Sequence, residues 1–458
     1  MGGGKVREAE ERTDMKIRHG ALGSVCRAGA GLIAAALLLL CGGAAGAETR
    51  VLTLEQALAI AAEKNRDIEK ARAYIAWARG RYVEERAAAF PQLTASATLG
   101  RDRDESQKIY GPLMTATTDR RSAQVVVTQP LFTWGQVSAA IRAATVGLQS
   151  ADEQLRVFRQ AASRDVSAAF TDVLLARELH SLARHSLEQR KRHRDEARRK
   201  FQAGVATDYD VLAAEVSVEN ALPETIRTEN QIRTARERLR FLLAMESGEV
   251  DAAGTLAAEF TPVRSYEEAF ALARARRPDL ADLRHRVGVA RELVVLADAQ
   301  DKPRIDLRGS YGWNYLEQPN LYADGPSWGV GIQLSYPFFD GLRTRGRVAQ
   351  AKSDLKRVEI DAAKQIDAIA LETREAVNNL GEAELIVRSL SGTVGQAERL
   401  LAMAEQGYEL GVKTRLEVED AELNLRQARG SLSRSRRDYI VARVNLDWVM
   451  GILGEEPR

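Results

Sequence analysis

The stretch AGVATDYDVLAAE (residues 203–215) has a counterpart in LGVKTRLEVEDAE (residues 410–422). In both stretches Gly-Val is followed by a Thr two residues after the Val, and by a carboxylate three residues after that Thr. The two glycines, Gly204 and Gly411, are 207 residues apart in a chain of 458 residues. Two matching turns at this distance indicate an internal duplication.

Other segments repeat at nearly the same spacing. The matching pairs are TLEQALAIAAEKNRDI (53–68) with SYEEAFALARARRPDL (265–280), TQPLFTWG (128–135) with SYPFFDG (335–341), and RLRFLLAM (238–245) with NLDWVMGI (445–452). The first pair is offset by 212 residues and the other two by 207. We therefore predict a first repeat over 48–250, a linker over 251–264, a second repeat over 265–454 and a tail over 455–458.

The N-terminus has the pattern of an export signal over residues 1–47. Arg18 and Arg27 precede the apolar run GLIAAALLLL (31–40), and AGA (45–47) provides a small-residue cleavage site. Met15 is an alternative start, because the residues before it are charged and add nothing to such a signal.

Both cysteines lie within this segment, so the exported chain is expected to contain no disulfide. Cys41 as a lipid attachment site remains an alternative, although Leu40 stands where such signals usually have Gly or Ala.

Each repeat is predicted to contain a short helix, two strands and two long helices joined by a turn. Thr53 and Gln56 form a capping box, which predicts the start of a helix over about 53–89. Alternating apolar and polar residues predict the strands. The remaining elements are strands at about 92–101, 121–131, 304–314 and 327–338, long helices at about 136–201, 207–245, 340–406 and 414–453, and turns at about 202–207 and 407–414.

The longest helices cannot belong to a compact domain. From 136 to 201 and from 340 to 406 no proline interrupts a heptad-like pattern. At about 1.5 Å per residue each helix would be roughly 100 Å long. Apolar positions such as Ile360, Ile366 and Ile369 form one stripe, so these helices need partner helices in coiled-coil contact.

The predicted strands have the length needed to cross an outer membrane. Aromatic residues stand at their ends, as in interfacial girdles: Phe132, Trp134, Phe338 and Phe339 on one side, Trp313 and Trp328 on the other. A small soluble sheet with an aromatic core remains an alternative on this evidence alone. Four strands cannot close a barrel, whereas cyclic symmetry closes one, and three copies give the smallest sensible channel, of twelve strands.

Composition excludes other classes of protein. The net charge is only +2, so there is no electrostatic case for nucleic acid. The basic run EQRKRHRDEARRK (188–200) contains acids and lies in a predicted helix, which favours a solvated helix exterior, with assistance to partner docking as an alternative. No catalytic motif or metal-ligand spacing occurs, so we expect no enzyme activity, metal or cofactor.

The chain closely resembles the TolC-like outer-membrane efflux proteins. The resemblance rests on LTLEQALAIAAEKN, FPQL, TQPLFTWG, GVATDYDVL and GVKTRLEVEDAE, and covers nearly all of residues 49–453. It implies a mostly α fold with a membrane β-barrel portion. Each chain would supply four strands and long coiled-coil helices, and a homotrimer would form a twelve-stranded barrel continued by a twelve-helix periplasmic tunnel.

The family also implies a function and partners. Its members are outer-membrane exit ducts of tripartite efflux pumps or type I secretion systems in Gram-negative bacteria. They are joined to an inner-membrane transporter of RND or ABC type by a periplasmic adaptor, and they contact outer-membrane lipid. The competing hypothesis is a periplasmic coiled-coil scaffold or adaptor without a barrel. That hypothesis does not account for two strand pairs with aromatic ends.

The resemblance assigns roles to the turn residues. Glu417 and Asp420 share a helical face and correspond to the family's pore constriction, where threefold symmetry would stack them into two carboxylate rings. The alternative is that these carboxylates only interact favourably with the helix dipole, and we expect this for Glu419. A Lys413–Asp210 pair and a Tyr408 hydrogen bond are the expected gate links.

The apolar turn residues are expected to dock the adaptor, with ordinary turn packing as the alternative. These residues are Ala203, Gly204, Val205, Leu410, Gly411 and Val412.

Overall fold

The computed structural model describes residues 50–104, 116–318 and 321–454. Nearly all of them belong to one compact unit, Val51–Met245 with Val250–Arg458, and this unit is described below. A second unit, Met1–Arg50 with Glu246–Glu249, contributes few described residues. The expected signal over 1–47 and the tail over 455–458 lie outside the described residues.

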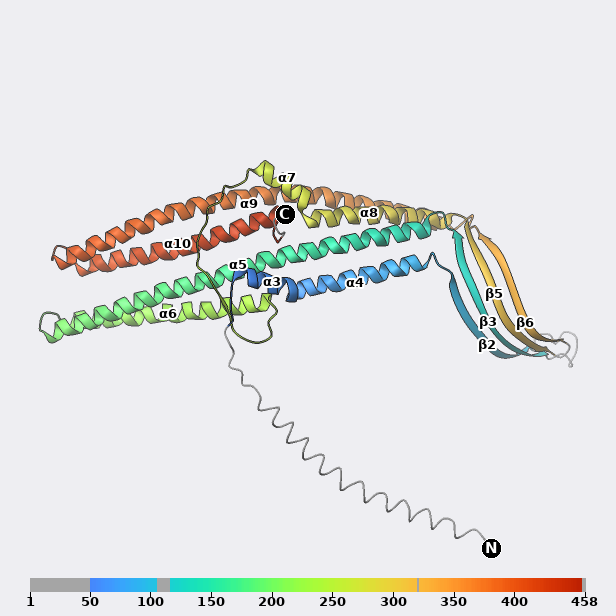
Figure 1. The fold of residues 1–458 in the computed structure, drawn as a ribbon, viewed down its shortest axis with the longest axis horizontal. Coiled ribbons are helices and arrows are strands. Elements are labelled where there is room, and N and C mark those ends of the chain that lie inside the picture. Colours follow the sequence, from blue (N-terminus) through green and yellow to red (C-terminus); the bar gives the residue numbers. More distant parts are fainter. Residues whose placement is uncertain (1–49, 105–115, 319–320, 455–458) are drawn as a thin grey trace, which may run out of the picture. The chain divides into compact units, whose positions relative to one another are not determined.

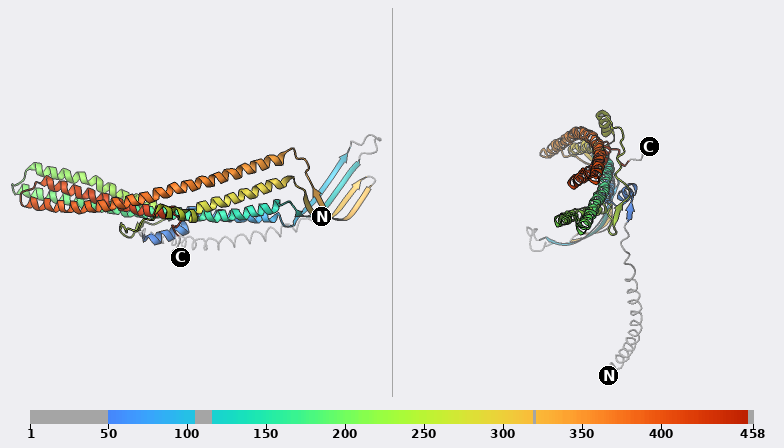
Figure 2. Two further views of the ribbon diagram at one scale, coloured as in Figure 1. Left: turned by 90° about the horizontal axis from the view of Figure 1, so that it is seen from above. Right: turned by 90° about the vertical axis from the view of Figure 1, so that its left-hand side faces the viewer.

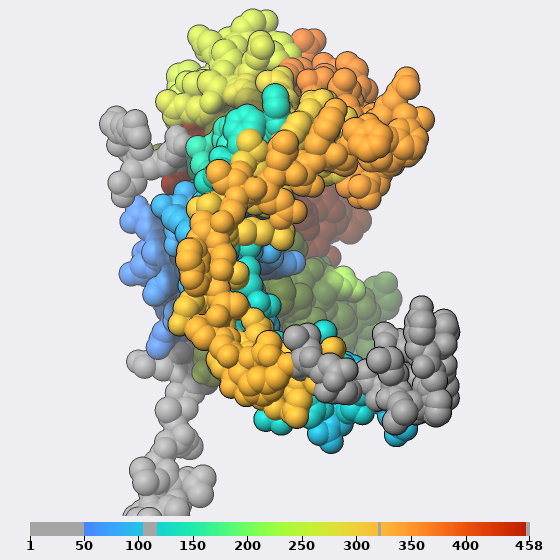
Figure 3. Space-filling view, turned by 90° about the vertical axis from the view of Figure 1, so that its right-hand side faces the viewer, coloured from blue at the N-terminus to red at the C-terminus, as the bar shows by residue number. Residues whose placement is uncertain are grey.

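Four long strands form one curved antiparallel sheet in the order β2-β3-β5-β6 (Figures 1 and 3). They are β2 (Gln92–Asp104), β3 (Ala116–Phe132), β5 (Arg304–Gln318) and β6 (Leu321–Ser335). Where the paired strands meet, they extend beyond the expected ranges of 92–101, 121–131, 304–314 and 327–338. Arg101 and Asp119 explain part of this extension, because their side chains form two hydrogen bonds of 2.5 and 2.6 Å across the strand pair.

The prolines near the strand ends have different effects in the two repeats. Pro130 lies inside β3, where the register shifts between Pro130 and Phe132. β6 instead stops at Ser335, short of the expected end at 338. Pro337 follows closely and has no N–H to donate to a ladder.

The long helices have equal lengths in the two repeats. Helices α5 (Gln136–Gln202) and α9 (Arg343–Glu409) have 67 residues each. Helices α6 (Asp208–Leu242) and α10 (Arg415–Val449) have 35 residues each. Every boundary in the second set lies 207 residues after its counterpart, which confirms the tandem duplication.

The single helix expected over 53–89 was a wrong prediction, because the structure has two helices there. They are α3 (Leu54–Lys64) and α4 (Arg66–Ala87), and their counterparts are α7 (Tyr266–Arg276) and α8 (Pro278–Asp298), the latter followed by a short 3-10 helix, Ala299–Asp301. The expected capping box of Thr53 and Gln56 does form. Asn65 breaks the helix by accepting hydrogen bonds from the Asp67 and Ile68 backbone N–H groups, as an N-cap does.

The helices form a layer with α5 and α9 running its whole length (Figures 1 and 2). Helices α4 and α6 both pack on α5, and α8 and α10 lie between α5 and α9. Asn65 joins α4 to α6, since its Nδ2 donates to the Leu242 carbonyl at 2.9 Å. The sheet follows one end of α4, α5, α8 and α9, and the two helix turns form the other end of the layer.

The two main cores bury equivalent positions. Ala57, Leu239 and Leu243 in the first core correspond to Ala269, Leu446 and Met450 in the second. The short strands β1 (Arg50–Leu52) and β4 (Val250–Ala252) form a separate two-stranded sheet. Among the described helices, none combines the length and hydropathy required for a membrane span.

Candidate functional site

The first turn (residues 203–207) joins α5 to α6, which together form the first hairpin. Gly204 has φ 76°, a left-handed conformation that glycine adopts without steric cost. The N–H of Val205 donates to the Lys200 carbonyl at 2.9 Å, which closes α5 with a Schellman motif. Thr207 then caps α6 in a capping box with Asp210. The duplicated sequence thus forms a rigid reversal of the chain.

The second turn (residues 410–414) repeats this geometry between α9 and α10, the second hairpin. Gly411 has φ 75°, and the Val412 N–H donates to the Gly407 carbonyl at 2.9 Å. Thr414 caps α10 in a capping box with Glu417. In both turns a glycine therefore occupies the left-handed position and a threonine caps the helix that follows.

Lys413 has a different partner within the chain from the one expected. Its Nζ lies 2.5 Å from Glu417 Oε1. Asp210 instead accepts hydrogen bonds from the backbone N–H and the hydroxyl of Thr207, both at 2.8 Å. The expected Lys413–Asp210 pair is therefore replaced, inside one chain, by two separate local interactions.

Glu417 is held in its charged form. The hydrogen bond from Lys413 and then those from Thr414 lower the pKa of the Glu417 carboxyl to about 2. Because Lys413 neutralises this charge locally, Glu417 differs from Asp420, which is exposed and forms no ion pair or hydrogen bond with a described side chain. Glu419 pairs with Arg415 at 3.0 Å, so of these acids only Asp420 retains an uncompensated charge.

Tyr408 contacts the first hairpin, through a residue that the sequence did not suggest. Lys200 Nζ lies 3.4 Å from the Tyr408 hydroxyl and 5.6 Å from the centroid of its ring. The same ammonium pairs with Glu196 at 2.8 Å, and these two partners raise the pKa of Lys200. Lys200 therefore links the ends of α5 and α9.

The duplication offset could have revealed Lys200. It occupies the position equivalent to Gly407, and Ala206 is equivalent to Lys413. A Cβ on Gly407 would lie 2.4 Å from Cγ of Lys413, so the second turn accommodates its lysine only because a glycine faces it. The first turn thus has a lysine before the turn and an alanine within it, whereas the second has a glycine before the turn and a lysine within it.

The apolar turn residues are exposed within the chain. Val205, Leu410 and Val412 are 74%, 79% and 76% exposed, as expected for a contact surface. Ala203, Gly204 and Gly411 are exposed beside them. Tyr209 and Leu416 extend this apolar surface at equivalent positions in the two repeats.

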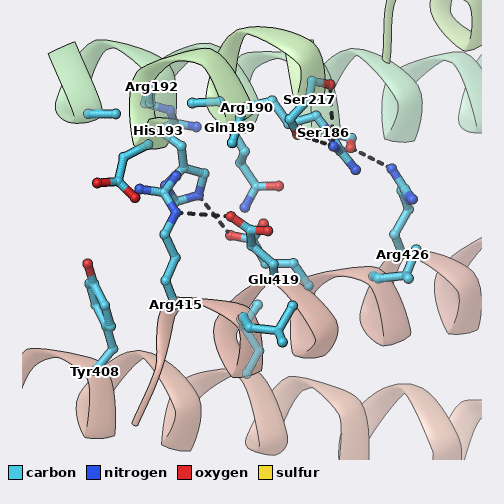
Figure 4. A pocket seen from close by; sticks show the side chains of 18 of the residues that line it. Ser186, Gln189, Arg190, Arg192, His193, Ser217, Tyr408, Arg415, Glu419 and Arg426 are labelled. Atoms are coloured by element: carbon cyan, nitrogen blue, oxygen red, sulfur yellow. Dashed lines mark hydrogen bonds and ion pairs between the residues drawn. The ribbon is translucent and has the colours of Figure 1, made fainter. Parts of the chain in front are cut away.

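A groove of about 870 Å³ separates the two hairpins near the turns (Figure 4). Both hairpins line it, and polar side chains bridge it. His193 Nε2 of α5 lies 3.3 Å from Glu422 Oε1 of α10. Arg415, Tyr408 and Asp210 also line the groove, so two of the three candidate gate residues, Tyr408 and Asp210, share one surface.

The sheet is amphipathic, and its register places most of the large apolar side chains on one face. That face carries Leu93, Leu99, Val125, Val127, Leu307, Tyr311, Trp313, Trp328, Val330, Ile332 and Leu334. The opposite face carries Thr94, Ser96, Thr98, Ser122, Gln124, Arg308, Ser310, Asn314, Ser327 and Gln333. In a barrel wall such alternation places apolar residues toward lipid and polar residues toward the lumen.

This sheet leads into helices that lead to the paired turns, and the sequence matches a family with that architecture. Residues 57–245 and 270–452 match the family described as "Outer membrane efflux protein". The chain belongs to the outer membrane efflux protein family. Each matched segment lies within one of the two repeats. Membership of the family therefore rests on the duplicated architecture and not on one motif.

Several characterised members of the outer membrane efflux protein family resemble the chain over most of its length. It is 25% identical to the outer membrane protein TolC of Vibrio cholerae, covering 82% of this chain and 85% of that protein. It is 29% identical to the alkaline protease secretion protein AprF of Pseudomonas aeruginosa, covering 81% and 78%. An outer-membrane location follows for this chain.

Solved structures show the same fold. A membrane protein from Pseudomonas aeruginosa has a TM-score of 0.76 with 24% identity, covering 87% of this chain and 92% of that one. The structure of CusC has a TM-score of 0.75 with 18% identity, covering 90% and 95%. The expected fold class, long tunnel helices with a barrel portion, is confirmed.

Proposed function

We propose that this chain is the outer-membrane exit duct of an efflux or secretion system, and that three copies form it. The observation that carries this proposal is the amphipathic sheet with one large apolar face. In water that face would be an exposed apolar patch of a kind rare on soluble monomers. In lipid it is stable, provided that every backbone group is paired.

The strand order supports closure by symmetry. In the sheet β2-β3-β5-β6 all neighbours are antiparallel, so the first and last strands also run in opposite directions. β6 of one copy can therefore pair with β2 of the next without breaking the antiparallel pattern. Three copies give twelve strands, enough to leave an open lumen, whereas eight strands are filled by side chains.

The turns are the proposed inner mouth of this duct. Three copies would place six turns around it. Each copy would also contribute Glu417 and Asp420, which lie at the start of α10. We assign the cation-attracting charge mainly to Asp420, because Lys413 already compensates Glu417. The Lys200–Tyr408 contact is the proposed link that holds the two hairpins together in the closed mouth. Each such exposed link contributes only about 0–1 kcal/mol, which suits a gate that a partner opens.

The exposed apolar turn residues are the proposed docking surface for a periplasmic adaptor, which would connect the duct to an inner-membrane transporter of RND or ABC type. AprF is described as a secretion protein, whereas another relative from Burkholderia cepacia is described as a fusaric acid resistance protein. Polypeptides and small molecules are thus both compatible cargo classes.

The function is tested by reconstituting the purified protein into a planar lipid bilayer. The duct should produce discrete, cation-selective conductance steps, and the Lys200→Met variant should open more often than the wild type. Purified protein that inserts but never conducts would contradict the proposal. Docking is tested separately: Val205→Asp with Val412→Asp should abolish adaptor capture while the conductance is retained.

A further inference from the structure

Two arginines face each other across the groove between the hairpins, above the turns. Arg190 of α5 donates to the hydroxyl of Ser217 and, at 3.3 Å, to its carbonyl. Arg426 of α10 donates to the Ser186 hydroxyl of α5 at 2.7 Å. Figure 4 shows both guanidinium groups directed into the same part of the groove.

These two arginines differ from three cations around them that pair with carboxylates. Arg415 pairs with Glu419, Arg429 with Glu398 and Lys200 with Glu196. Within the described chain, neither Arg190 nor Arg426 forms an ion pair with a carboxylate, and serine oxygens are their partners instead. Arg192 also lines the groove without an ion-pair partner among the described residues, but it donates to the Glu188 carbonyl of its own helix, whereas Arg190 and Arg426 face each other across the groove.

The electrostatics of Arg426 agree with this geometry. Burial and then the charge of Arg190 lower the pKa of Arg426. Glu224 and Glu422 act on it more weakly from a distance. Both carboxylates are engaged elsewhere, Glu224 with Arg227 at 2.7 Å and Glu422 with His193 at 3.3 Å. The two guanidinium groups thus repel each other in a partly desolvated place.

We propose that Arg190 and Arg426 form a binding site for a small multivalent oxyanion, with inorganic phosphate as the representative ligand, that bridges the two hairpins. Guanidinium groups present paired N–H donors that match phosphate oxygens. Ser186 and Ser217 accept from the arginines, so their own hydroxyl hydrogens remain available to donate to the same ligand. A bound oxyanion removes the repulsion and ties α5 to α10.

The position of the site favours an ion from solution over a side chain of a docked protein. Arg426 lies eleven residues into α10, which places it roughly 17 Å from the start of that helix. The exposed apolar surface proposed for docking is at the turns instead. The site is therefore separate from the docking surface, and its occupancy does not require a partner.

The test is calorimetric titration of the purified detergent-solubilised protein with inorganic phosphate, against sodium chloride of equal ionic strength. We expect one phosphate per chain, and an affinity at least tenfold weaker in Arg190→Gln and in Arg426→Gln. Arg429→Gln is the matched control, because it removes one positive charge from the same groove but from a residue that already pairs with Glu398.

Charge reversal keeps the test decisive if a glutamine variant folds poorly. In Arg426→Glu the new carboxylate can pair with Arg190, so the hairpins stay together while phosphate binding is lost. Wild-type protein that gives no heat beyond the chloride control would overturn the proposal. So would an equal loss in Arg429→Gln, unchanged binding in Arg426→Glu, or binding of an acidic peptide without binding of phosphate.

Discussion

The Lys413 ammonium and the Glu417 carboxylate form an ion pair of 2.5 Å across the first turn of α10. One residue of the expected acidic ring is therefore already matched by a cation from its own chain. Asp420, three residues further along the same helical face, has no such partner among the described residues. The two carboxylates should consequently differ in their effect on permeating ions.

Neutralising Asp420 should weaken cation selectivity more than neutralising Glu417. Asp420→Asn removes an uncompensated charge, whereas Glu417→Gln leaves Lys413 unpaired and adds a net positive charge nearby. Lys413→Met should increase selectivity by exposing the Glu417 charge. Reversal potentials in a potassium chloride gradient measure all three. Equal selectivity in wild type and Asp420→Asn would reject the assignment of Asp420 to the constriction.

The second turn should lose its ion pair only in strong acid. The pKa of Glu417 is about 2 in the folded chain and 4.5 in the ordinary group. A lowered carboxyl pKa contributes stability that is fully present above about pH 4.5 and is lost as the pH falls toward 2. The carboxyl carbon signal that disappears in Glu417→Gln should therefore titrate well below the ordinary glutamate value of 4.5. Lys413→Met should raise this pKa, since Lys413 is its largest cause.

Gly407→Ala should destabilise the second turn, because the new Cβ would lie 2.4 Å from Cγ of Lys413. Overpacking of this kind costs about 1–3 kcal/mol. Lys413→Ala should rescue it, because it removes the Cγ that the new Cβ would contact and places alanine where the first turn has Ala206. The double-mutant cycle is measured by hydrogen exchange of the Val412 amide. Additive effects of the two substitutions would show that the contact does not exist.

An arginine on the apolar face of the sheet should prevent assembly, whereas one on the polar face should be tolerated. Ile332 and Gln333 are neighbours in β6 on opposite faces. Arginine facing lipid near the bilayer centre costs about 2–4 kcal/mol. Ile332→Arg should therefore lower the amount of folded protein in outer membranes far more than Gln333→Arg. The reverse order would invert the assignment of the two faces.

Much of the fold could be predicted because the sequence contains two copies of the same pattern. The 207-residue offset and the Gly-Val-x-Thr turns determine the ends of the long helices to within a few residues. Asn65 was missed because it caps α4 inside a stretch whose helical pattern continues on both sides of it. The first strand pair was predicted too short where β2 and β3 meet, since Arg101 and Asp119 look like loop residues until their cross-strand pairing is known.

The candidate site was predictable in position but not in pairing. The glycines, the caps and the exposed apolar residues follow from local rules. The partner of Lys413 does not, because Glu417 and Asp210 are both plausible carboxylates in a sequence. Lys200 could have been found by comparing the two turns position by position, as its equivalent is Gly407. Arg190 was hidden inside a basic run whose other members are paired or solvated.

We infer that one chain supplies a third of a closed membrane barrel. Native mass spectrometry of the protein extracted from outer membranes, with detergent removed in the gas phase, tests this most directly. We expect a single assembly with the mass of three chains. A monomer of native mass, extracted without detergent and stable in water, would contradict it.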